Sequence, residues 1–444
     1  MLEISHVIAN KLSARLPFYY GWVVVFAAGT TVFARMAPTT TTLAVFLSSM
    51  SEEFGWSRTL IAGSVSVGAF SSIFLTPIVG WAVDRYGARL ILAGSMLVLG
   101  VAMVSLAWAT VPVFFYVGFA TARVIFHVPV QIGSGALISR WFIRKRGRAI
   151  GVIYLAGAIG GIVTIQIASL AISHWSIGAA WITLGVLVLA ISVLPSALLI
   201  VGRPEDIGLE PNNRISPRFP NASDEARGNL PVIPNQVEDG WSPRQAMRTR
   251  ALWVLTGVVG ALFMVQAVIS VHMGAFYQDR GLSLTAAAFA ITINAIVNAF
   301  ASLVWGAIIE KASVRWAMTG LMLLSAVSSL VLLAVNLHLS ALAASAVLGL
   351  VSAGSNVIPP VAFASYFGRR SIGSIRGIGE TGVQIGQTIG AVFSGLVYDF
   401  SGSYVIAFLT FSLLGLVSAV VVSSSRPPIK EATRGSAAID LGVK

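Results

Sequence analysis

Twelve apolar runs, each long enough to cross a lipid bilayer, constrain this chain more than any other feature of its sequence. Crossing the hydrocarbon core takes about 20 consecutive apolar residues. The runs lie near residues 19–47, 57–81, 88–109, 111–140, 147–173, 178–201, 251–277, 284–310, 314–337, 339–366, 374–398 and 403–423. Only 10% of the 444 residues are charged, whereas a soluble domain carries about 25%. The sequence therefore predicts an all-α integral membrane protein.

The second half of the chain repeats a polar signature of the first half. Residues 80–89 (GWAVDRYGAR) and 306–315 (GAIIEKASVR) share a glycine, an acidic residue, a basic residue and a final arginine at the same spacing. Residues 53–57 (EFGWS) and 279–283 (DRGLS) match at the same offset along the chain. Such self-similarity indicates two structural repeats. Repeated membrane bundles are typical of transporters built around a pseudo-two-fold axis.

The basic residues predict the orientation of the chain. Loops that stay in the cytoplasm retain Lys and Arg. The net charge is +12, and all of the basic residues except Arg35, Arg58, Arg123 and Arg280 fall on the side that holds both termini. Both termini are therefore expected in the cytoplasm. The basic residues are also scattered over short loops between the apolar runs, so the positive net charge does not indicate nucleic-acid binding.

Four segments follow from this topology. Residues 202–250 are rich in Pro, Asn and Arg, and such a segment cannot bury enough apolar surface to fold alone. We expect an N-terminal six-helix bundle at 1–201, a cytoplasmic linker at 202–250, a C-terminal six-helix bundle at 251–423 and a cytoplasmic tail at 424–444.

Two halves of six helices, the long linker and the GxxxDRxGxR loop after the second helix together resemble the major facilitator superfamily over essentially the whole chain. Further motifs resemble its monocarboxylate-transporter and oxalate/formate-antiporter-like branch. They are FYYGWVVV in helix 1, FGWSR before helix 2, WFIRKRGRAIGV entering helix 5, and His272 with DRGLS after helix 7. The resemblance implies a twelve-helix transporter that works by alternating access.

Two departures from that branch leave the substrate open. Animal monocarboxylate transporters carry a helix-1 lysine and a helix-8 aspartate-arginine pair, where this chain has Thr39, Asn298 and Ser302. The oxalate/formate antiporter uses an arginine on helix 8 and a lysine on helix 11, where helix 11 of this chain offers glutamate and glutamine. The charged residues that bind substrate in those transporters are therefore not found at the corresponding positions of this chain.

Two arginines lie inside apolar runs, where a charge costs about 2.5 to 3.5 kcal/mol on insertion scales. If helix 1 enters the membrane near Tyr20, Arg35 lies about 22 Å along it, just beyond the midplane. Arg123, His127 and Gln131 follow at i, i+4 and i+8 on one face of helix 4. The arginines are placed to hold an anionic substrate or to pair with backbone carbonyls, and the sequence leaves both interpretations open.

Helix 11 carries Glu380, the acidic residue that lies clearly inside a run, about 9 Å from the cytoplasmic end. Gln384 and Gln387 lie within about 60° of it around the helix. A desolvated carboxyl favours its neutral form and can carry a proton. An interfacial carboxylate paired with Arg376, one turn earlier, is the alternative.

Neutral polar residues complete the predicted site. Asn294 and Asn298 on helix 8 and Asn356 on helix 10 can hydrogen-bond a ligand or bridge helices. The predicted substrate-binding residues are Arg35, Thr39, Arg123, His127, Gln131, Asn294, Asn298, Asn356, Gln384 and Gln387, with Glu380 as the proton-coupling residue.

The resemblance also implies gating by the repeated loops. Asp84 near the positive N-terminal end of helix 11 would hold the two halves together when the cavity opens outward. The alternative is that these charges only set the topology. The predicted gating residues are Asp84, Arg85, Arg89, Glu310, Lys311 and Arg315.

Enzyme chemistry is not indicated. The five His are scattered, Cys is absent, and neither an ordered Ser/His/Asp set nor HExxH occurs. A non-transporting membrane sensor would carry an added soluble domain. We therefore expect a secondary active transporter for a small organic anion, a mono- or dicarboxylate, driven by protons or by exchange. Proton-driven efflux of small apolar or aromatic drugs is the alternative.

The expected partners follow from that function. They are a small carboxylate, a coupled H+ and the lipid bilayer of a bacterial inner or cell membrane, with no nucleic acid, cofactor or metal. We expect the protein to act as a monomer.

Overall fold

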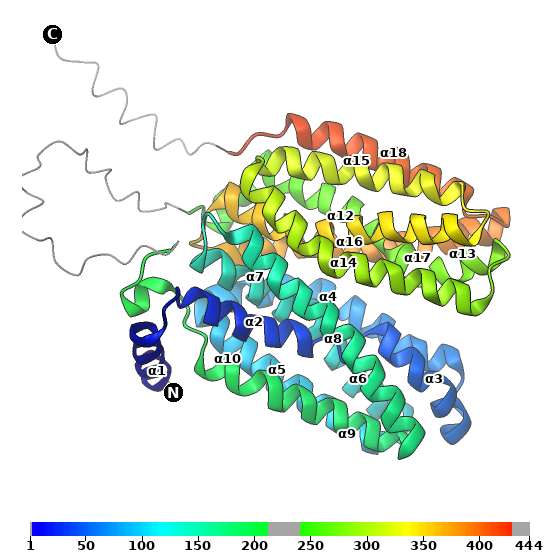
Figure 1. The fold of residues 1–444 in the computed structure, drawn as a ribbon, viewed down its shortest axis with the longest axis horizontal. Helices are drawn as coiled ribbons and strands as arrows, with labels where there is room; N and C mark the ends of the chain where they lie inside the picture. The colour runs from blue at the N-terminus through cyan, green and yellow to red at the C-terminus, as the bar shows by residue number, and fades with distance from the viewer. Residues whose placement is uncertain (1, 212–239, 429–444) are drawn as a thin grey trace, which may run out of the picture.

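The computed structural model describes residues 2–211 and 240–428, and the regular elements within them are all helices (Figure 1). Most of the long helices run along one common direction. They form two bundles that lie against each other, one before residue 201 and one after residue 250.

The N-terminal bundle holds the helices of the first six runs. They are α2 Gly21–Ala34 with α3 Thr40–Phe54, α4 Arg58–Tyr86, α5 Ala88–Ser105 with the 3₁₀ turn η1 Leu106–Trp108, α6 Pro112–His127 with α7 Pro129–Trp141, α8 Arg146–His174, and α9 Ile177–Val188 with the π turn η2 Leu189–Val193 and α10 Leu194–Leu198. A further helix, α1 (Leu2–Arg15), lies outside the bundle and across its direction in Figure 1. This helix is not among the twelve predicted runs.

The C-terminal bundle holds the helices of the last six runs. They are α12 Arg250–Val271 with α13 Met273–Asp279, α14 Leu284–Lys311, α15 Val314–Leu333, α16 His338–Phe367, α17 Ile372–Ser401 and α18 Val405–Ser424.

Each predicted run thus contains a helix, and the predicted fold class is confirmed. By length and composition, ten helical spans of the described residues could cross a membrane, and α2 is a shorter apolar helix. The polar helix α17 is not among the ten spans. It carries Arg376, Glu380 and two glutamines, which lower its hydropathy even though its 30 residues are long enough.

The described ends of the predicted linker pack against the bundles at one end of the molecule. The helix α1 and the end of α18 also lie at that end, which we call the termini side (Figure 1). The short helices η3 (Pro204–Ile207) and α11 (Pro243–Met247) form here. The Trp241 N–H donates to the Phe367 carbonyl at 3.0 Å. The described ends of the predicted linker therefore form short helices that pack on the bundles, while residues 212–239 and the tail from 429 lie outside the described residues.

Two spans of the N-terminal bundle are broken near their middle. Residues 35–39, which include Pro38, separate α2 from α3, and Val128 separates α6 from α7 ahead of Pro129. Proline lacks an N–H group and clashes with the preceding turn, so a helix cannot pass through it regularly. The breaks release backbone carbonyls inside the bundle, and these carbonyls need donors from elsewhere.

Glycines let the two bundles touch at backbone distance. A Cβ atom at Gly80 on α4 would lie 2.5 Å from the carbonyl oxygen of Gly373 and 3.0 Å from the Cα atom of Gly377 on α17. Gly147 on α8 and Gly306 on α14 make the equivalent contact, where either Cβ would collide with the other glycine's carbonyl oxygen. Small residues permit such close helix packing in membranes.

This contact predicts that Gly80→Val opens the termini side. Overpacking costs about 1 to 3 kcal/mol, which shifts a conformational equilibrium about 5- to 150-fold. The chain has no native cysteine, so spin labels at Tyr86→Cys and Arg370→Cys report the distance between the bundles. We expect longer distances in the Gly80→Val variant than in the parent protein.

Gly94→Val on α5 is the matched control, because a Cβ there would meet no atom within 4 Å. It should leave the distance distribution unchanged. Identical distributions in the Gly80→Val variant and its parent would show that this contact does not set the closed arrangement.

Candidate functional site

A small cavity of about 90 Å³ lies between the two bundles. Its walls come from the break after α2, from α6 and α7, and from α12, α16 and α17. The lining residues are Arg35, Phe126, His127, Gln131, Phe263, Asn356, Glu380, Val383, Gln384 and Gln387. Drug-sized ligands occupy pockets of about 300 to 1,000 Å³, so in this conformation the cavity has room only for a small solute.

The cavity brings together seven of the residues that the sequence analysis selected, three from the N-terminal bundle and four from the C-terminal bundle. They are Arg35, His127, Gln131, Asn356, Glu380, Gln384 and Gln387. Phe126, Phe263 and Val383 were not selected, because an apolar side chain in an apolar run gives no sequence signal of cavity lining.

Arg35 is 5% exposed and sits where α2 ends. Its Nη1 donates to the Phe126 carbonyl at 3.0 Å and to Gln131 Oε1 at 2.7 Å. Its guanidinium also lies 5.0 Å from the Phe126 ring and 5.9 Å from the Tyr154 ring. Arg35 Nε is buried and has no hydrogen-bond partner in the described part of the chain. Arg35 therefore pairs with a backbone carbonyl and also forms part of the cavity wall.

Glu380 pairs with Arg376 inside α17. Arg376 Nη2 lies 2.7 Å from Glu380 Oε1, and the two residues are 1% and 6% exposed. Glu380 Oε2 and Arg376 Nη1 have no partner among the described residues. Arg376 also reaches across to the N-terminal bundle, because a Cβ at Gly135 on α7 would collide with its Nη1. The pairing that the sequence left as an alternative is present, at the wall of the same cavity as Arg35.

Arg123 lies outside the cavity wall, behind His127. Its Nη1 donates to the Pro38 carbonyl at 3.2 Å, and its Nη2 lies 2.8 Å from His127 Nε2. The guanidinium stacks 4.9 Å from the Phe126 ring. In this conformation Arg123 supports the break between α2 and α3 and positions the imidazole that lines the cavity.

Three further predicted residues do not line the cavity. Thr39 caps α3, where its hydroxyl accepts from the Thr42 N–H at 3.3 Å. Asn294 Nδ2 donates to the Ser345 carbonyl at 3.3 Å and bridges α14 to α16. The Asn298 carbonyl accepts the Ser302 hydroxyl at 2.8 Å. A polar stripe on α14 predicts a polar face, but the packing of α14 against α16 and α8 decides what that face meets.

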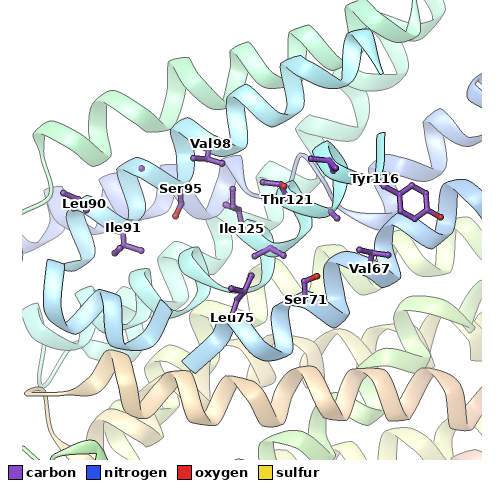
Figure 2. Close-up of a pocket in the computed structure, with 14 residues that line it drawn as sticks. Val67, Ser71, Leu75, Leu90, Ile91, Ser95, Val98, Tyr116, Thr121 and Ile125 are labelled. Carbon is purple, nitrogen blue, oxygen red and sulfur yellow. The ribbon is translucent and has the colours of Figure 1, made fainter. Parts of the chain in front are cut away.

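A larger cavity of about 700 Å³ lies between α4, α5 and α6 (Figure 2). Its wall is mostly apolar, with the hydroxyls of Ser71, Ser95, Tyr116 and Thr121, and it contains no Lys, Arg, Asp or Glu. Val117 in this wall is 65% exposed, and in a bilayer such a surface faces acyl chains. We assign it no solute role, because its lining comes from the N-terminal bundle alone and carries no charged group.

Asp84 holds the two bundles together at the termini side. Its Oδ1 accepts from the Gly373 N–H at 2.9 Å and its Oδ2 from the Ser374 N–H at 2.6 Å. These groups open α17, and a helix N-terminus carries partial positive charge. Arg140 Nη2 donates to the same carboxylate at 2.8 Å. In the sequence Arg140 lies beside a basic loop, a position that indicates a topological charge and does not reveal this partner.

Glu310 makes the reciprocal contact from the C-terminal bundle. Its Oε1 accepts from the Arg148 N–H in the first turn of α8 at 3.1 Å, and its Oε2 lies 2.8 Å from Arg148 Nε. Each bundle therefore supplies a carboxylate to a helix start of the other bundle. The internal repeat of the sequence places these two carboxylates at equivalent positions.

The other four predicted gating residues contact groups within their own half of the chain or line a cavity. Arg89 Nε donates to the Ala197 carbonyl at 2.9 Å, and its Nη1 bonds to the Ser5 hydroxyl of α1. Arg85 lies over the rings of Trp81 and Tyr86, and Arg315 over the ring of Trp316. Lys311 lines a separate cavity at the termini side. Within the described residues, no three His, Cys, Asp or Glu side chains form a group that could hold a metal ion.

Comparisons with known proteins agree on one family and fold. A sequence model described as the Major Facilitator Superfamily matches residues 21–291 and 262–441. The proton:xylose symporter XylE, solved with 6-bromo-6-deoxy-D-glucose, matches with a TM-score of 0.68 and 14% identity over 90% of this chain and 94% of its own. FucP, a Major Facilitator Superfamily transporter in the outward conformation, matches with a TM-score of 0.66 and 15% identity over 91% and 100%. Among curated proteins no sequence matches.

The contacts of Asp84 predict that Asp84→Asn releases the termini side. Asparagine loses the ion pair with Arg140 and leaves one of the two helix N–H groups unpaired, and hydrogen bonds to a charged group contribute about 1.5 to 3 kcal/mol each. The spin labels at positions 86 and 370 should move apart, and substrate exchange in proteoliposomes should slow while affinity stays near that of wild type. Glu53→Gln, an exposed acid near the far end of α3, is the control. Unchanged distances together with normal exchange would count against a gating role for Asp84.

Proposed function

We propose that this chain, which belongs to the Major Facilitator Superfamily, is a secondary active transporter for a small organic anion, a mono- or dicarboxylate. It works by alternating access around the cavity between its two bundles. In this proposal the termini side lies in the cytoplasm, and the distribution of Lys and Arg supports that orientation. The described conformation is therefore closed on its cytoplasmic side.

The observation that carries the anion assignment is the charge balance at the cavity. Three buried arginines, Arg35, Arg123 and Arg376, lie at or next to the wall, against the single carboxylate of Glu380. The excess positive charge is costly in a membrane interior unless an anion compensates it. An arginine binds a carboxylate through two parallel N–H bonds, and Arg35 Nε has no partner within the described residues.

The size of the cavity supports a small substrate over a bulky drug. At about 90 Å³ it is well below the range of drug-sized pockets. Its two aromatic side chains, Phe126 and Phe263, stand among seven polar residues. This lining favours a short carboxylate over the apolar compounds of the efflux alternative.

Glu380 supplies the route for proton coupling. A protonated Glu380 no longer neutralises Arg376, so a proton and an anion can enter the site together at constant net charge. Releasing the proton restores the 2.7 Å pair and removes the attraction for the anion. This links substrate charge to proton movement through one carboxyl group.

A neutral polyol is the second candidate. Gln131, Asn356, Gln384 and Gln387 present four amide groups to the cavity, and amides hydrogen-bond hydroxyl groups well. The structural neighbour XylE is a proton:xylose symporter, although at 14% identity the likeness supports the fold alone. The role of Arg35 discriminates between the two candidates.

Arg35→Gln should nearly abolish anion binding, and Arg35→Lys should weaken it. Removing one partner of a desolvated charge pair costs about 3 to 5 kcal/mol, or about 100-fold or more in affinity. Lysine keeps the charge but not the two-pronged geometry. The measurement is binding and uptake of whichever of lactate, oxalate or succinate stabilises the wild-type protein.

Arg123→Gln is the matched comparison, because Arg123 is as buried as Arg35 but lies outside the cavity wall. It should lose much less affinity. All variants must first elute as single monodisperse species in detergent. Wild-type binding and uptake of the carboxylate by folded Arg35→Gln would rule out Arg35 as the anion anchor.

Glu380→Gln should uncouple transport from the proton gradient. Glutamine cannot ionise, so a pH gradient should no longer drive accumulation of the anion, while exchange of anion for anion continues. The measurement is uptake in proteoliposomes with and without an imposed pH gradient, beside counterflow in the same vesicles. Gradient-driven accumulation that survives in the variant would make Glu380 a structural residue.

A further inference from the structure

A second polar cavity, of about 530 Å³, lies between the bundles at the termini side. It shares no residue with the central cavity. The N-terminal bundle supplies residues 143–148, at the start of α8, and the C-terminal bundle supplies the end of α14, the start of α15 and part of α16. The lining residues are Ile143, Arg144, Lys145, Arg146, Gly147, Arg148, Ile309, Glu310, Lys311, Val314, Val361 and Ser365.

This cavity is strongly positive. Five of its lining residues are basic and one is acidic, and the acid, Glu310, is already paired with Arg148 at 2.8 Å. Within the described part of the chain, Lys145 and Lys311 form neither a salt bridge nor a side-chain hydrogen bond. Lys145 and Lys311 therefore give the cavity positive charge that its own acid does not neutralise.

The wall is fixed rather than a loose cluster of surface charges. Arg146 is 5% exposed, its Nε donates to the Phe142 carbonyl at 3.0 Å and its Nη2 to the Ser139 carbonyl at 3.1 Å. The cavity also lies at the first turn of α8, where the N–H group of Arg148 donates to a carboxylate oxygen of Glu310. Positive-inside topology explains basic residues in a loop, but it does not require a hollow that both bundles line.

We propose that this cavity binds a phosphate group. Phosphate matches the site because several cations can share its oxygens and because arginine and lysine both bind it well. Basic pockets between membrane helices on the cytoplasmic side suit the headgroups of anionic lipids. The group can belong to a phospholipid headgroup or to a soluble phosphate compound, since the lining is the same for both.

Such binding regulates the transport cycle. The walls come from both bundles, so a phosphate held between residues 144–148 and Lys311 bridges them in the closed arrangement. A ligand that binds one state better shifts the population toward that state. Phosphate therefore stabilises the form that is closed at the termini side.

The test measures thermal unfolding of the purified full-length protein in phosphatidylcholine nanodiscs. One arm adds inorganic pyrophosphate at constant ionic strength, and the other replaces part of the lipid with phosphatidylglycerol. We expect stabilisation in at least one arm, and the arm that responds identifies the source of the phosphate. The Arg35→Gln variant should respond as the wild type does, which separates this site from the central cavity.

Lys145→Gln should weaken the response about fivefold in apparent affinity, because each Lys or Arg near an anionic surface contributes about that factor. Lys145→Glu should weaken it further. Lys11→Gln, an exposed lysine of α1 on the same side, is the matched control and should bind as the wild type does. Absence of stabilisation in both arms, or equal losses in Lys145→Gln and Lys11→Gln, would overturn the proposal.

Discussion

A guanidinium group buried in a membrane protein must find hydrogen-bond acceptors, and much of this structure follows from that requirement. The two breaks in the N-terminal bundle release carbonyls inside the membrane, and the buried arginines use them. Arg35 at the end of α2 donates to the Phe126 carbonyl beside the break in α6 and α7, and Arg123 on α6 donates to the Pro38 carbonyl in the break between α2 and α3. Each break thus supplies the acceptor for the arginine of the other span. The arrangement fixes Arg35 at the central cavity with one N–H group still unpaired within the described residues.

The contact between the bundles follows the repeat in the sequence. Asp84 caps the start of α17, and its counterpart Glu310 reaches the first turn of α8. Glycine pairs beside each cap bring the backbones close enough for these short bonds. Both caps join groups on opposite bundles, so they exist only while the termini side is closed. A transporter that alternates between two states needs contacts of this kind, which are satisfied in one state and released in the other.

The fold could be predicted from the sequence because its signals are local: the length of apolar runs, the placement of basic residues and the repeated loops. Seven of the residues that line the cavity could be selected from the sequence. A polar residue inside an apolar run is costly unless it faces a cavity or another polar group. Asn294 and Asn298 do not line this cavity, because a helical stripe gives a direction but not the neighbour, which depends on how α14 packs. The partner of Arg140 and the helix α1 were missed for a related reason, as both depend on contacts between segments far apart in the chain. A count along the helix places Glu380 near the cytoplasmic end of its run, but it does not show that the side chain is buried at the cavity wall.

The central claim is that the cavity around Arg35 accepts a small anion, and a matched pair of ligands tests it most directly. Lactate and lactamide have nearly the same shape and differ in charge, as do oxalate and oxamide. The unfolding temperature of the wild-type protein should rise when the carboxylate is added and should not change when its amide is added. A ligand at 100 times its dissociation constant adds about 2.7 kcal/mol of stability. Stabilisation by xylose or by the amides, with none from any carboxylate, would contradict the claim and favour a neutral substrate.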